Sequence, residues 1–133
     1  MINSRKLGAH KGLIALSAAL AFGATNALAI EDCGSPEKPT MPDGSTASME
    51  QMLEGQKAVK AFQADLKMHL ECLDKHMAAA EDAASKTDDA DEKATHQAAY
   101  NEAFNAYNAA VSSEEEVAGD FNVALRAYKA ANK

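Results

Sequence analysis

The sequence predicts an all-α protein, in which two long antiparallel helices form a helical hairpin or coiled coil behind an extended, proline-containing N-terminal segment. All three prolines lie within residues 30–46, so nothing after Pro42 imposes a proline break. The remainder is rich in Ala, Glu, Lys and Gln, which favour helices. Its large apolar residues recur in a seven-residue pattern, and no segment shows the apolar–polar alternation of a strand.

Residues 1–29 are predicted to be a secretory signal peptide. The segment has a basic start, an apolar stretch over residues 13–24 and a small-x-small site at Ala27–Ala29. Twelve apolar residues span about 18 Å of helix, well short of a bilayer core of about 30 Å, so a membrane anchor is disfavoured. A lipid anchor is also disfavoured, because three residues separate Ala29 from Cys33.

Cleavage after Ala29 leaves 104 of the 133 residues, with 10 basic and 20 acidic side chains and a formal charge of −10. We therefore expect a periplasmic or secreted protein in an oxidising compartment. The negative charge argues against nucleic acid and anionic lipid surfaces as partners. No further long apolar run follows, so no membrane insertion is expected after cleavage.

The segment 30–46 is predicted to be extended. Pro36, Pro39 and Pro42 recur every three residues, which places their rings on one face of a polyproline II helix. Pro42-Asp43-Gly44 is a turn signature. Ser48 and Gln51 then have the spacing of a capping box at the start of a helix.

The first helix is expected at about residues 47–84. In heptad notation its a positions are Met52, Val59, Leu66, Leu73 and Ala80, and its d positions are Gly55, Phe62, His69, His76 and Ala83. The polar run at residues 85–89 interrupts this pattern, with Thr87 or Asp88 as the next helix cap.

The second helix is expected at about residues 89–131, within a hairpin domain that spans 47–132. Its a positions are Gln97, Phe104, Val111, Ala118 and Leu125, and its d positions are Tyr100, Tyr107, Glu114, Phe121 and Tyr128. Two overlapping capping boxes begin at Ser112 and Ser113, so a break and a three-helix bundle are an alternative. The unbroken heptad phase favours a continuous helix.

A turn centred between Lys86 and Thr87 makes the numbers of facing residues add up to about 173. This register pairs Leu66 with Tyr107 and Met52 with Phe121, and it sets Gly55 against Ala118 beside Gly119. The two heptad patterns are thus compatible with one short loop.

Cys33 and Cys72, the two cysteines of the chain, are predicted to form an intramolecular disulfide. The 26 residues from Thr46 to Cys72 span about 39 Å as helix, and the 13 from Cys33 to Thr46 about 40 Å as polyproline II. A ribbon folded back along the first helix therefore reaches Cys72. The alternatives are an intermolecular bridge and a thiol metal ligand.

The pattern of Cys33, Pro36, Pro39 and Pro42-Asp43-Gly44, followed by Met49, Phe62 and Cys72-Leu73, resembles that of small uncharacterised exported proteins of Gram-negative bacteria. The resemblance implies the same disulfide-linked helical architecture and carries no activity.

Enzymatic function is not expected. The sequence has no glycine-rich nucleophile elbow, and a two-helix rod offers no deep cleft. The acidic runs at residues 88–92 and 114–116 lack the glycine and the spacing of a calcium loop and fit a solvated surface.

We therefore expect an exported non-enzymatic helical protein that acts as an envelope scaffold, adaptor or partner-binding module. Aromatic residues left exposed on the second helix could make it a homodimer. The alternative is a periplasmic Cu or Zn protein that uses His76, His96 and Met77, since the predicted register brings the two histidines near each other. No cofactor is expected under the favoured hypothesis.

Overall fold

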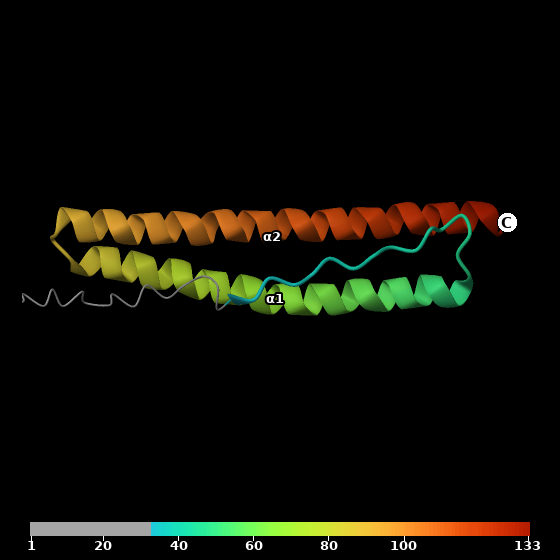
Figure 1. Ribbon diagram of the computed structural model, residues 1–133, viewed down its shortest axis with the longest axis horizontal. Coiled ribbons are helices and arrows are strands. Elements are labelled where there is room, and N and C mark those ends of the chain that lie inside the picture. Colours follow the sequence, from blue (N-terminus) through green and yellow to red (C-terminus); the bar gives the residue numbers. More distant parts are fainter. Residues whose placement is uncertain (1–32) are drawn as a thin grey trace, which may run out of the picture.

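The computed structural model describes residues 33–133; the predicted signal peptide, residues 1–29, lies outside this range. Two long helices, α1 (Met49–Lys86) and α2 (Ala90–Ala131), run antiparallel along each other (Figure 1). The described residues contain no strand. The prediction of an all-α helical hairpin is thus confirmed.

The start of α1 is fixed by the predicted capping box. The backbone N–H of Gln51 donates to Oγ of Ser48 at 3.2 Å, and the N–H of Ser48 donates to Oε1 of Gln51 at 2.8 Å. Two otherwise unpaired backbone donors are satisfied in this way. The helix begins and ends two residues later than expected.

The cap of α2 is Asp89 rather than Thr87 or Asp88. Its carboxylate accepts from the backbone N–H groups of Asp91 and Glu92 at 2.9 and 3.0 Å. Thr87 instead ends α1, and its hydroxyl accepts from the N–H of Asp89. Beyond this cap α2 runs unbroken through Ser112, whose hydroxyl donates to the carbonyl of Asn108 at 3.0 Å, so the three-helix alternative is wrong.

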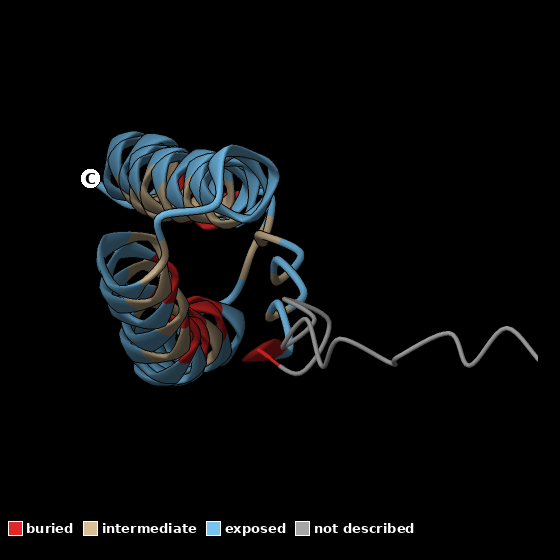
Figure 2. Ribbon diagram, turned by 90° about the vertical axis from the view of Figure 1, so that its left-hand side faces the viewer, coloured by how far each residue is buried: buried red, intermediate tan, exposed pale blue. Residues whose placement is uncertain are grey.

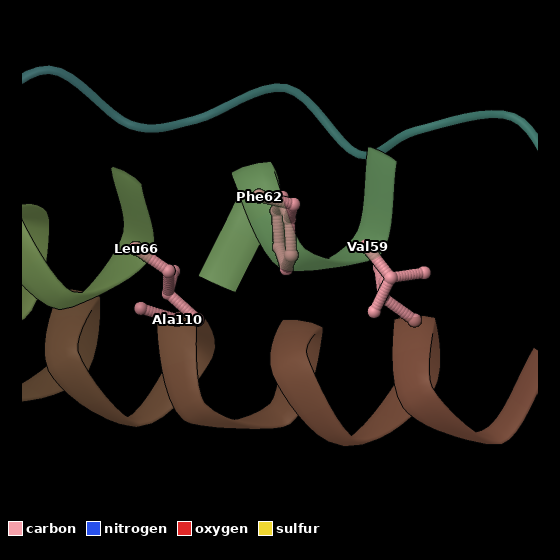
Figure 3. Packing of buried hydrophobic residues seen from close by; sticks show 5 residues of the cluster. Val59, Phe62, Leu66 and Ala110 are labelled. Carbon is pink, nitrogen blue, oxygen red and sulfur yellow. The ribbon is translucent and has the colours of Figure 1, made fainter. Parts of the chain in front are cut away.

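The buried face of α1 follows the predicted heptads. Its buried residues are the five predicted a positions and three of the d positions, namely Gly55, Phe62 and His69. Leu73 is fully buried. Figure 2 shows the buried residues of α1 turned toward the neighbouring helix, and Figure 3 shows Leu66 and Ala110 pointing at each other from the two helices.

The buried face of α2 differs from the prediction by one position. The buried residues are Ala103, Ala110, Val117 and Ala124, each one residue before a predicted a position. The predicted aromatic residues are only half-buried, and Phe104 is 46% exposed. Leu66, Phe62 and Leu73 already fill the space between the helices, so small residues opposite them allow close packing.

The register also differs from the prediction. Nε2 of Gln63 donates to Oε1 of Glu114 at 3.3 Å, and a Cβ built on Gly55 would lie 3.4 Å from Cε2 of Phe121. The numbers in these pairs, as in Leu66 and Ala110, add up to 176 or 177 rather than 173. The connection is centred on Asp88, later than assumed.

Two specific pairings are corrected by this shift. Phe121, which was predicted to face Met52, lies next to Gly55, which was predicted to face Ala118. Gly119 is open, since a Cβ added to it would meet nothing within 4 Å. Gly55 instead lies under the ring of Pro42, whose Cδ would be 2.9 Å from an added Cβ. The missing side chain of Gly55 therefore makes room for the N-terminal segment.

Residues 33–46, called the leader here, form a third layer (Figures 1 and 2). The leader starts beside the middle of α1, follows the helices to the far end of α2 and turns back into α1. Cys33 is buried and the three prolines are half-buried, which agrees with the predicted shared face. Met41 packs against the hydrophobic core.

The turn of the leader is pressed against the C-terminal part of α2. A Cβ on Gly44 would lie 1.8 Å from the carbonyl oxygen of Ala124, so only glycine fits there. The carboxylate of Asp43 accepts from the backbone N–H and the hydroxyl of Ser45 at 3.0 and 2.6 Å. These hydrogen bonds lower the pKa of Asp43 below its usual value.

Candidate functional site

The predicted disulfide is present. Cys33 at the start of the leader is bonded to Cys72 in the middle of α1, with their Cα atoms 5.5 Å apart. The bond closes a loop over a sequence separation of 39. Neither an intermolecular bridge nor a pair of free thiols describes this structure.

A hydrogen bond of His69 joins the leader to α1 next to the disulfide. Its Nδ1 lies 3.0 Å from the carbonyl oxygen of Cys33, and the side chain is buried. Because a carbonyl oxygen only accepts, Nδ1 must carry the proton in this bond. The sequence predicted His69 between the helices but gave no sign of this partner.

His76 completes a cluster around the disulfide. The sulfur atoms of Cys33 and Cys72 and a ring nitrogen of His76 all lie within 4.8 Å of one another. Cys72 and His76 are four residues apart, so both side chains lie on one side of α1. Within residues 33–133 no other group of three or more cysteine, histidine or acidic side chains meets this criterion.

The predicted metal residues His76, His96 and Met77 are not gathered in this cluster. In the observed register His96 lies opposite Ala80. Ala80 is four residues after His76, so the two histidines are offset by about 6 Å along the helix axis. Met77 follows His76 and therefore points about 100° away around α1. His76 lies instead beside the two sulfur atoms.

Two open grooves border the leader. One has a volume of about 520 Å³ and is lined by both cysteines, His69, Asp65 and Met68 together with residues 34–36. The other, about 730 Å³, runs between the leader and α2. Its α2 wall consists mostly of small residues, with Glu102 and Glu116 among them. Lys38 bridges this groove by an ion pair with Glu116 at 2.6 Å.

The opposite side of the helix pair carries an apolar surface that the leader does not cover. On α2 this surface consists of residues that were predicted to lie in the core but are not buried there. On α1 it consists of residues seven and fourteen positions after Gln63, on the side where Gln63 donates to Glu114. We call it the open stripe; it comprises Leu70, Met77, Tyr100, Phe104, Tyr107, Val111 and Leu125. The rings of Tyr100 and Phe104 are stacked, with centroids 6.3 Å apart.

Neither helix of the described residues contains an apolar run that could cross a membrane. Comparisons of the chain with protein-family models, with curated proteins and with solved structures found no match.

Proposed function

We propose that the protein is an exported, non-enzymatic partner-binding module, which uses its open stripe to dock an amphipathic helix of another chain. The observation that carries this proposal is the displacement of the large residues of α2 from the core. Phe104 remains 46% exposed, although a buried aromatic ring contributes more hydrophobic free energy than most other side chains.

The spacing of the open stripe favours a helix as the docked element. Tyr100, Phe104, Tyr107 and Val111 follow one another at intervals of four, three and four residues. Helix-in-groove complexes use this pattern of anchors. A second copy of the chain offers the same pattern, and two such pairs would form a four-helix bundle.

Charge favours a basic edge on the partner. Residues 33–133 carry 18 acidic and 10 basic side chains. The resulting field attracts a partner with Lys or Arg beside its apolar face and repels an acidic one. A second copy would therefore associate more weakly at low salt than at high salt, where the like charges are screened.

Site-specific photocrosslinking tests the docking surface. A photoreactive amino acid at position 104 is compared with one at position 123, where Val123 is also exposed but lies on α2 outside the open stripe. The proposal expects crosslinks to a protein, including a second copy, from position 104 only. Equal yields at both positions, or none, would contradict it.

A second measurement separates a second copy from other partners. Light scattering of the purified protein gives its mass in solution, and we expect Phe104→Glu, but not Val123→Glu, to reduce any dimer to monomer. A wild-type monomer together with a crosslink at position 104 assigns the stripe to a different protein.

Export is the other half of the proposal. It is supported by the signal-peptide pattern of residues 1–29, by the disulfide, which suits an oxidising compartment, and by the resemblance to exported proteins. Mass spectrometry of the protein from its native cells should give a chain that begins at Ile30 and is two hydrogens lighter than its reduced form. Intracellular protein beginning at Met1 would contradict export.

A further inference from the structure

We propose that reduction of the disulfide converts Cys33, Cys72 and His76 into a zinc site that keeps the leader fastened to α1. This site is independent of the docking function proposed above. It also differs from the pair of histidines that the sequence suggested, because both sulfur atoms take part and His96 does not.

The ligand atoms are already close to the required positions. Zinc binds thiolate sulfur at about 2.3 Å and imidazole nitrogen at about 2.0–2.1 Å in tetrahedral geometry, which places neighbouring ligand atoms about 3.5–3.8 Å apart. The three atoms of the cluster lie within 4.8 Å of one another. Separating the two sulfurs, and moving the imidazole inward by no more than about 1.3 Å, completes a site with a fourth, open position.

Cys33 stays near α1 when the bond between the sulfurs is broken. Its carbonyl oxygen accepts the hydrogen bond from buried His69 at 3.0 Å, and this contact does not involve the sulfur. Gly44 is in contact with α2 at the other end of the leader. The cysteine is therefore held beside its two partner ligands, and His69 acts as a positioning residue.

Both a reductant and a cation can reach the cluster. Cys33 and Cys72 line the open groove of about 520 Å³, so the disulfide borders solvent. Asp65 lines the same groove, and its negative charge makes the approach favourable to a cation. Cys72 and His76 are each half-buried.

The reaction requires a dithiol reductant. One of its thiolates attacks a sulfur of the protein disulfide, and its second thiol then displaces that sulfur from the mixed disulfide. The two electrons and two protons of the dithiol end on Cys33 and Cys72, and the reductant becomes a disulfide. Zn²⁺ then replaces the two thiol protons, which pass to solvent.

The donor set selects the metal. Two thiolates and one imidazole suit Zn²⁺, whereas Ca²⁺ and Mg²⁺ require oxygen ligands. Because the ligands come from both the leader and α1, the bound zinc would replace the covalent connection by a coordinated one. The sulfur of Cys33 then lacks any bond to α1 only when the protein is both reduced and without metal.

Cobalt titration tests the site. The exported chain is reduced with a phosphine, which is then removed without oxygen, and Co²⁺ is added as a spectroscopic substitute for Zn²⁺. We expect one Co²⁺ per chain, a thiolate-to-cobalt absorption band and loss of that band when Zn²⁺ is added. The oxidised protein should show no band.

His76→Ala and His96→Ala form a matched pair, since both histidines are half-buried on a helix and only His76 lies in the cluster. We expect His76→Ala to weaken binding by about a hundredfold or more, because residues that merely orient a ligand contribute about 10–100-fold. His96→Ala should leave binding unchanged.

Equal affinity in these two variants, or a complex of two chains per metal, overturns the proposal. The melting temperatures of the oxidised variants are measured first, because the disulfide should keep both variants folded. If oxidised His76→Ala melts earlier than the wild type, His76→Gln is used in its place. Zn²⁺ should also raise the melting temperature of the reduced wild type and not that of Cys33→Ser.

Discussion

The two flanks of the helix pair are built in opposite ways. The flank under the leader presents small residues of α2, such as Ala106 and Ala109, and an extended chain covers it. The opposite flank presents Tyr100, Phe104 and Tyr107 and has no cover from residues 33–133. The large side chains of α2 therefore lie beside the core, whereas those of α1, such as Phe62 and Leu73, fill it.

This difference shows what the leader contributes. An extended chain that makes no backbone–backbone hydrogen bonds to the helices needs a close fit, and small residues and glycines provide it. The covalent bond at Cys33 and the contact at Gly44 then secure both ends of the leader. The comparison can be tested by loosening these attachments in turn.

The largest expected effect comes from Cys72→Ser. A loop closed over 39 residues stabilises the folded state by about 4 kcal/mol in the chain-entropy model. We expect urea denaturation of the variant to show a loss of this size relative to the oxidised wild type. Cys33→Ser should lose the same amount, and a reductant should affect neither variant.

The next effect is expected at the other end of the leader. Gly44→Ala would place a methyl group 1.8 Å from the carbonyl oxygen of Ala124, which forces the turn away from α2. We expect a loss of about 1–3 kcal/mol, typical of overpacking, in the urea-derived free energy of unfolding.

Gly119→Ala is the matched control for this substitution. An added Cβ at Gly119 meets nothing within 4 Å, so the variant should gain about 0.5–1 kcal/mol from the better helix propensity of alanine. Similar effects of the two substitutions would show that the leader turn does not pack on α2 as described.

A smaller effect is expected for Lys38→Ala. The ion pair of Lys38 with Glu116 joins leader and α2, but the two side chains are 49% and 59% exposed. Exposed pairs contribute about 0.2–1 kcal/mol, so the urea midpoint should decrease only slightly. Glu116→Ala should have the same effect, and the double variant should lose no more than either single one.

The smallest effect concerns pH. The folded protein lowers the pKa of Asp43 below the unfolded value of 3.8, so the ionised carboxylate stabilises the turn above that value. This contribution is lost as the pH falls through the lowered pKa. The urea midpoints of wild type and Asp43→Ala should differ at pH 7 and converge near pH 2. A constant difference would assign the effect to other contacts of the turn.

The fold and the capping box at Ser48 could be predicted from the sequence because each depends on local spacing. The disulfide could be predicted because the chain has two cysteines at matching distances from the turn of the leader. Which face of α2 is buried could not be predicted, since the largest apolar residues of this helix were expected to point inward. In the structure the leucines and Phe62 of α1 occupy that space, and alanines face them. The packing of one helix thus determined which residues of the other are buried.

The candidate site was predicted in part. The sequence predicted the disulfide of Cys33 with Cys72 and named His76 as a metal ligand, but it did not place His76 beside the two sulfur atoms. The expected partnership of His76 with His96 depended on the register, and a small displacement of the turn, from between Lys86 and Thr87 to Asp88, was enough to change it. The hydrogen bond of His69 involves a backbone carbonyl, which no residue pattern reveals.

The ring closed by the disulfide contains the leader and α1 as far as Cys72, whereas α2 lies outside it. A protease that cuts the leader once would therefore release no fragment, and the nicked protein would keep its mass, increased by one water molecule, until it is reduced. A cut between the two helices would separate α2 from the rest of the chain. Resistance to proteolysis thus depends on protecting the short connection at Thr87–Asp89 more than on protecting the leader.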